Sequence, residues 1–166
     1  MGSKPAKPVL IHTDCRHYLG SMPCVFHKNE GRLCEGCVDY APVKTRILVV
    51  KLAAVGDVLR TTSILPSLAR KYPGAEITWI TRTNATPLLK GNPLIDRVLS
   101  IEENHLEFLL NESFSLGICL DADSQSATIH SLTRCDQRFG FIARPTIRSY
   151  MRFVDCRSQP FVRNSI

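Results

Sequence analysis

The sequence predicts an α/β protein built on a parallel sheet, preceded by a small cysteine-rich segment. From residue 46 onward, apolar runs alternate with amphipathic segments, and the alternation repeats four times at short spacing, which is typical of βαβ units. The first run, residues 46–52 (RILVVKL), is nearly continuous in aliphatic side chains, as expected of a strand buried on both faces. Upstream, four of the seven cysteines fall between residues 15 and 37, in a stretch without helical or alternating periodicity.

The expected elements follow in chain order. We expect strands over residues 46–52, 76–82, 96–101 and 116–121, with a fifth over 137–141. A turn over residues 55–57 should lead into a helical stretch that runs to about residue 72, and further helices are expected over residues 86–92, 104–112 and 124–133. Pro66 lies inside the first of these, so that helix either kinks or restarts there. Gly91 and Pro93 end the second.

Composition divides the chain into a mobile end (1–12), a cysteine-rich metal-binding module (13–44), the sheet domain (45–142) and an irregular arginine-rich tail (143–166). The formal charge of +6 is uneven, because residues 38–137 carry ten basic and eleven acidic side chains whereas residues 138–166 carry six and one. The central domain therefore lacks the electrostatic footprint of a nucleic-acid-binding protein. No apolar run approaches the ~20 residues of a membrane span, and the start has no export signal. We expect a cytoplasmic protein without a transmembrane segment.

The loop after the first strand, residues 52–58 (LAAVGDV), carries one glycine and one acid. In an open parallel sheet this loop borders the ligand crevice beyond the carboxyl ends of the strands. Gly56 would permit a positive φ and a close approach of the backbone, and a single glycine excludes the dinucleotide and Walker A fingerprints. Asp57 would stand in the first turn of the next helix, where it could accept a proton from a hydroxyl or simply cap the helix.

An ordered series of short motifs surrounds this loop. The first strand runs into Lys51, four residues precede the Gly-Asp-Val, and RTT (60–62), YPGAEITW (72–79) and PLLKGNPLIDRV (87–98) follow. In this series the chain resembles a family 9 glycosyltransferase, the heptosyltransferase family of lipopolysaccharide assembly. The resemblance continues through residues 117–141, so it covers about residues 46–141.

The resemblance implies a GT-B architecture of two Rossmann-like domains, of which this chain would supply the amino-terminal, acceptor-binding one. It implies that Asp57 is the catalytic base that deprotonates the acceptor hydroxyl, with no metal needed for the transfer. Gly56, Lys51 and Asp121 are the candidate substrate-binding residues. Asp121 could instead cap the next helix, and Lys51 could orient Asp57, meet an acceptor phosphate or be a solvated strand end.

The implied partners are a sugar acceptor of lipopolysaccharide type and a nucleotide-sugar donor, together with a peripheral contact with the inner membrane. Members of the family are much longer, and the donor-binding domain is missing here, so we expect this chain to be inactive by itself. The tail after residue 141 departs from the family pattern, which suggests a truncated or frame-shifted product.

The leader offers four soft metal ligands in the spacing C-x8-C-x9-C-x2-C, namely Cys15, Cys24, Cys34 and Cys37. A disulfide framework is not expected in the cytoplasm, whereas a structural zinc site would explain how a segment without a core folds. An iron-sulfur cluster and free thiols are the alternatives. His17 and His27 are weaker candidates, His27 as a substitute ligand. A similar cysteine-rich leader precedes the transferase domain in some bacterial relatives of the family.

A second function class fits the same cysteines: a zinc-dependent nucleic-acid-binding or scaffold module, in which the C-x2-C pair and the arginine tail contact nucleic acid. The near-neutral centre and the lack of interleaved aromatic and basic residues count against it. The sequence leaves the two sugars, the metal and the oligomeric state open.

Overall fold

The structure, a computed structural model of the chain, describes residues 10–19, 22–103, 106–142 and 152–155. The chain forms two compact units, residues 1–43 and residues 44–166. Most of the expected mobile end and most of the expected irregular tail lie outside the described residues.

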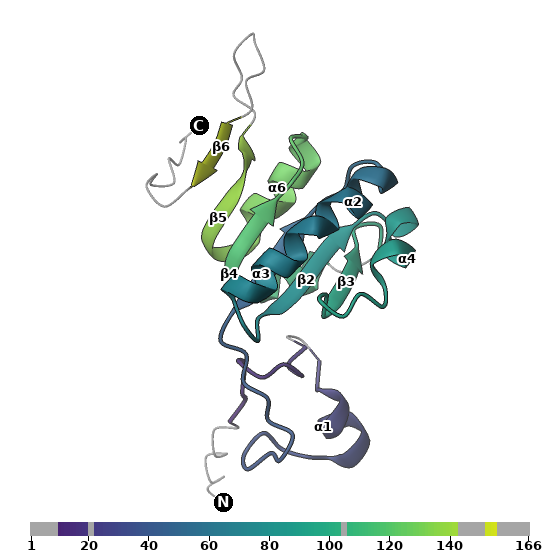
Figure 1. The fold of residues 1–166 in the computed structure, drawn as a ribbon. Helices are drawn as coiled ribbons and strands as arrows, with labels where there is room; N and C mark the ends of the chain where they lie inside the picture. The colour runs from purple at the N-terminus through teal and green to yellow at the C-terminus, as the bar shows by residue number, and fades with distance from the viewer. Residues whose placement is uncertain (1–9, 20–21, 104–105, 143–151, 156–166) are drawn as a thin grey trace, which may run out of the picture. The chain divides into compact units, whose positions relative to one another are not determined.

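The larger unit is built on a six-stranded sheet, with the described strands in the order β3-β2-β1-β4-β5-β6 (Figure 1). The strands are β1 (Arg46–Val50), β2 (Glu76–Thr81), β3 (Arg97–Ser100), β4 (Ser113–Cys119), β5 (Arg134–Ile142) and β6 (Arg152–Asp155). The first five pair in parallel, and β6 pairs antiparallel with β5. The expected parallel sheet is thus confirmed, and its order 3-2-1-4-5 is that of Rossmann-like folds.

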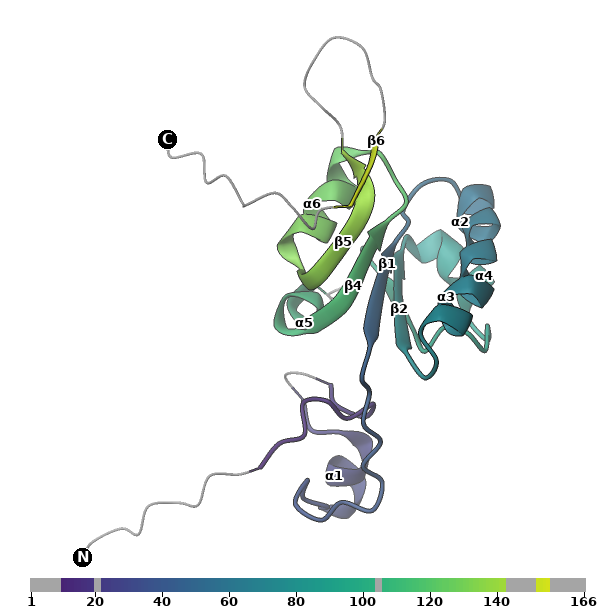
Figure 2. The ribbon, with the colours of Figure 1, turned by 60° about the vertical axis from the view of Figure 1, so that its left-hand side comes forward.

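Helices cover both faces of the sheet (Figure 2). One face carries α2 (Val55–Thr61), α3 (Leu65–Lys71) and α4 (Thr86–Leu89), and the other carries α5 (Leu106–Asn111) and α6 (Ser124–Leu132). Because side chains alternate along a strand, β1 contributes to both cores. The first core cluster joins Ile47 and Val49 to Val58 and Leu65, and the second joins Leu48 and Val50 to Leu109 and Ile129.

The expected helical stretch that runs to about residue 72 is divided, and it begins at Val55, where a turn was expected. α2 is followed by a 3-10 turn, η1 (Thr62–Ile64), and α3 then begins with Pro66 in its first turn. The restart is therefore the correct alternative, because proline needs no amide hydrogen bond at that position. A second 3-10 turn, η2 (Thr83–Ala85), precedes α4.

Several strand bounds differ from the expectation. β4 begins at Ser113, before the expected start at residue 116, because its first residues alternate between exposed and buried and form no continuous apolar run. β5 covers Arg134–Ile142 and is longer than expected at both ends. β6 lies within the tail to which no element was assigned.

Charged side chains form a network where the parallel strands begin. Arg46 Nε donates to Glu76 across the β1–β2 pair at 3.0 Å, and Arg97 Nη1 donates to Glu112 at 3.0 Å. Arg97 also pairs with Glu76. The side chains of Glu76 and Glu112 are 2% and 0% exposed, and burial raises the pKa of Glu112 against the opposing effect of Arg97. This network lies opposite the carboxyl ends of the parallel strands, where open α/β sheets bind their ligands, so we interpret it as structural.

The smaller unit contains one short helix, α1 (Val25–Glu30), and an isolated bridge between Cys15 and Pro42. The helix ends at Gly31, whose φ of 67° is the left-handed conformation common at helix ends. No residue of α1 is buried. Among the residues described in this unit, Val43 is the only hydrophobic one that is buried.

Candidate functional site

The strand order reverses beside β1. The chain passes from β1 to β2 and β3 on one side and then crosses to β4 on the other side. Open α/β sheets bind their ligands outside the carboxyl ends of the strands at such a switch point, because the loops there turn away from each other. In this chain the two loops are residues 51–54, after β1, and residues 120–123, after β4.

The loop after β1 leads directly into α2. Ala54 is the N-cap residue, and its carbonyl accepts the amides of Asp57 and Val58 at 2.8 and 3.1 Å. Gly56 lies inside this helix and is not among the described glycines with a positive φ. The positive φ that a glycine would permit here is therefore not used. A Cβ placed on Gly56 would meet no atom within 4 Å, so the start of the helix is open at this position.

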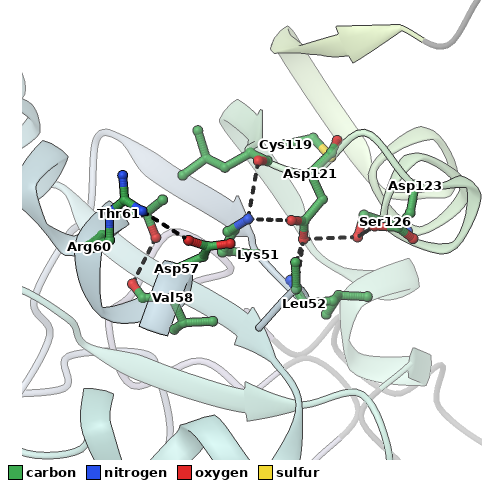
Figure 3. Close-up of polar contacts among 12 residues, drawn as sticks. Lys51, Leu52, Asp57, Val58, Arg60, Thr61, Cys119, Asp121, Asp123 and Ser126 are labelled. Carbon is green, nitrogen blue, oxygen red and sulfur yellow. Dashed lines mark hydrogen bonds and ion pairs between the residues drawn. The ribbon is translucent and has the colours of Figure 1, made fainter. Parts of the chain in front are cut away.

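The Asp57 side chain stands in the first turn of α2 and is 51% exposed (Figure 3). It makes no capping hydrogen bond, so the helix-cap interpretation of Asp57 is wrong. Its Oδ1 lies 3.4 Å from Nη1 of Arg60, which is itself 84% exposed. An ion pair this exposed is screened by water and holds its partners weakly. The carboxylate therefore remains accessible to a hydroxyl group.

Lys51 and Asp121 form a buried ion pair (Figure 3). Lys51 Nζ lies 2.5 Å from Asp121 Oδ1, and the two side chains are 8% and 3% exposed. The other carboxylate oxygen accepts the amides of Leu52 and Ala53 and the Ser126 hydroxyl, the last two at 3.1 Å. Asp121 thus ties the loop after β1 to the start of α6.

This burial bears on the roles expected of the pair. Lys51 is not a solvated strand end, and Asp121 does not cap α6. Neither side chain is open to a ligand as the structure stands, so the geometry favours a part in holding the loop that leads to Asp57.

Asp123, which the sequence analysis did not single out, is the N-cap of α6. Its Oδ1 accepts the amides of Gln125 and Ser126 at 2.9 and 3.0 Å, and its Oδ2 accepts the Ser126 hydroxyl at 2.7 Å. Partial burial acts to raise the pKa of Asp123, but these hydrogen bonds outweigh it and the pKa is lowered. The sequence carried a signal for this role, because Asp123 directly precedes the helix and aspartate is a common N-cap residue.

A second polar group at the same edge was also missed. Arg82, directly after β2, donates to Glu102 at 3.2 Å and to Gln125 of α6 at 2.8 Å. Glu102, after β3, accepts the Thr83 amide at 2.8 Å and the Ser100 hydroxyl at 2.9 Å. Partial burial raises the pKa of Glu102, yet the hydrogen bonds prevail and lower it to about 2. Because Arg82 and Glu102 neutralise each other, we interpret them as a tie between three loops.

The leader cysteines lie around one cavity of about 310 Å³, which all four of them line: Cys15, Cys24, Cys34 and Cys37. All four are half-buried, and none of them is in a disulfide. In the described part of the chain, no three Cys, His, Asp or Glu side chains are gathered closely enough to hold a metal ion. The structure therefore does not show the expected metal-binding module. Of the other cysteines, Cys119 is buried in β4, and Cys156 lies outside the described residues.

Solved structures with a similar fold include a family 9 glycosyl transferase and two E. coli heptosyltransferases. The chain is similar to the family 9 glycosyl transferase from Veillonella parvula DSM 2008, with a TM-score of 0.52 and 20% identity over 60% of this chain and 32% of that one. Its similarity to the E. coli ADP-heptose LPS heptosyltransferase II has a TM-score of 0.51 and 23% identity, and covers 57% of this chain and 30% of that one. Its similarity to E. coli heptosyltransferase WaaC with ADP has a TM-score of 0.51 and 22% identity, and covers 57% of this chain and 34% of that one. The chain shares their fold.

The likeness covers only about a third of the length of each of these structures. No protein-family model matches the sequence, and no curated protein matches it. Every helix in the described ranges is too short or too polar to cross a membrane.

Proposed function

We propose that this chain is the acceptor-binding part of a glycosyltransferase that moves a heptose-like sugar from a nucleotide-sugar donor to a lipopolysaccharide-type acceptor. The observation that carries the proposal is the position of Asp57, a half-exposed carboxylate beyond the carboxyl end of β1 and beside the switch point. The fold shared with heptosyltransferases, one solved with ADP and another named for ADP-heptose, supports the donor class.

In the proposed reaction Asp57 acts as a general base. The acceptor hydroxyl gives its proton to the Asp57 carboxylate while its oxygen forms a bond to the anomeric carbon of the donor. The bond between that carbon and the nucleoside diphosphate breaks, and the electron pair leaves with the diphosphate. A second domain would hold the donor, as the resemblance to two-domain transferases implies.

The other candidate residues would support this base. Gly56 leaves open space next to Asp57, which lets an acceptor approach the start of α2 without meeting a side chain. Lys51 and Asp121 would hold the loop that leads to Asp57. Asp121 accepts the two amides that follow Lys51 and so fixes the course of the chain into α2. These are positioning roles.

Acceptor binding can be tested on the chain by itself. We would titrate the ¹⁵N-labelled chain with an inner-core lipopolysaccharide oligosaccharide and follow the amide resonances. The amides of residues 52–58 should shift, and those of the leader should not. The Asp57→Asn variant should show similar shifts, because the amide keeps the shape of the side chain. A titration that leaves residues 52–58 unmoved would contradict acceptor binding at this site.

The role of the base needs turnover, which we would measure in a fusion of this chain to the donor-binding domain of a heptosyltransferase. Asp57→Asn should lower the turnover number by at least about 100-fold, the usual effect of a positioned base. Asp136→Asn, which changes an exposed carboxylate on β5, is the matched control and should behave as the parent. Near-parental turnover in Asp57→Asn would remove Asp57 as the base.

The nucleic-acid alternative depends on the arginine-rich tail, which lies almost entirely outside the described residues. A filter-binding assay at two salt concentrations tests it, because binding through phosphate contacts must weaken steeply with salt.

A further inference from the structure

The leader unit is too poorly packed to be stable through hydrophobic burial. Large apolar side chains are left open to water in it, with Met22, Leu33 and Val38 exposed by 63%, 58% and 84%. Segments of about 40 residues generally need a disulfide, a metal or a partner to fold. None of the four cysteines described in this unit is in a disulfide, so no such bond holds the described part of the leader together.

The backbone holds each leader cysteine at a turn. The Cys15 amide donates to His12 at 3.1 Å, and Cys15 also forms the bridge with Pro42. Cys24 is the N-cap residue of α1. The backbone thus places both residues in folded segments of the leader.

The second pair forms a tight turn. The Cys37 amide donates to the Cys34 carbonyl at 3.2 Å, and Gly36 has a φ of 71°. A turn with a positive φ at its third residue is of the kind that glycine favours. In a C-x2-C turn both sulfurs can reach the same ion. The local structure of the second pair is therefore that of a metal knuckle.

All four thiols line the same cavity, of about 310 Å³. From these observations we infer that the leader unit binds one zinc ion through Cys15, Cys24, Cys34 and Cys37. Because no three such groups in the described residues are within reach of a common ion, binding must draw the thiols inward until each lies about 2.3 Å from the metal. The cavity provides the room for this movement.

The site is closed and structural. Four thiols lose four protons as the ion binds, which leaves a tetrahedral centre with a net charge of −2 and no open position. The free energy of binding then stabilises the folded leader, which is why the unit does not need a hydrophobic core. His17 and His27 also line the cavity, but the proposal assigns them no bond to the metal.

We would purify the full chain without a histidine tag and measure its metals by mass spectrometry. One zinc per chain is expected, and an organomercurial should release it as four thiols are titrated. Cobalt substitution should give the absorption of tetrahedral thiolate-bound Co²⁺. The double variant Cys34→Ser/Cys37→Ser should lose the ion, whereas Cys135→Ser, on β5 of the other unit, should keep it.

The leader variant can lose its fold, so a chelator experiment on the parent chain accompanies it. Removal of zinc should collapse the amide signals of residues 10–43 and leave those of residues 46–142 in place, and zinc should restore them. Retention of zinc by the double variant would overturn the proposal. The same holds for a parent chain without bound metal, and for iron with labile sulfide in place of zinc.

Discussion

Replacing Asp121 by alanine should severely destabilise the larger unit. The substitution removes the partner of Lys51, whose side chain is 8% exposed and whose remaining acceptor is the Leu120 carbonyl at 3.5 Å. Leaving a buried charge unpaired costs about 3–5 kcal/mol, a large part of the ~5–15 kcal/mol by which a domain is stable. Trp79 is fully buried on β2 and is the only tryptophan, so its fluorescence in urea reports the unfolding of this unit.

A double-mutant cycle separates the ion pair from the hydrogen bonds of the loop. Lys51→Met should cost less than Asp121→Ala, because Asp121 keeps the two loop amides and the Ser126 hydroxyl. The double variant should recover part of the loss, since it no longer leaves an ammonium group buried alone. A loss below about 1 kcal/mol in Asp121→Ala, or full additivity in the double variant, would refute this reasoning.

The remaining predictions concern two glycines and one acid, all measured as urea midpoints against the parent. Gly56→Ala adds a Cβ in open space within a helix and should stabilise by about 0.5–1 kcal/mol; a loss would show that the site needs glycine for its backbone. Gly117→Ala places a Cβ 2.7 Å from both Cys135 Sγ and His130 Nε2 and should destabilise by about 1–3 kcal/mol; an unchanged midpoint would contradict the packing. The pKa of Glu102 in the folded chain is lowered from 4.5 to about 2. Its contribution to the free energy of unfolding is therefore present above pH 4.5 and is lost as the pH falls toward 2. The urea midpoint of Glu102→Gln should therefore fall less than that of the parent over this pH range. Parallel plots of the two midpoints against pH would refute the lowered pKa of Glu102.

Where an element depends on its own residues, the sequence was a good guide. The strand over residues 46–52 was predicted because a run of aliphatic residues can be buried on both faces only inside a sheet, and β1 covers Arg46–Val50. Pro66 marked the restart at α3. The strand β4 begins earlier than expected, because its first residues alternate in burial and form no continuous apolar run.

The site was predicted less completely than the fold. Asp57 was placed in the first turn of a helix, where the structure has it, since that follows from a strand, a short loop and a helix in sequence. The state of Lys51 and Asp121 could not follow in the same way, because these residues are 70 positions apart and meet only when β4 pairs with β1. Asp123 carried a cap signal of its own, and the choice between it and Asp121 depended on where α6 begins.

By itself, the sequence determined the alternation of strands and helices, the acid after the first strand and the spacing of four thiols, because each is a property of neighbouring residues. Only the tertiary structure decided the order of the strands, and with it the switch point beside which Asp57 lies. It also buried the Lys51–Asp121 pair and brought the four leader cysteines around one cavity. The physical reason is that contacts between distant residues are set by how whole elements pack, which no short stretch of sequence specifies.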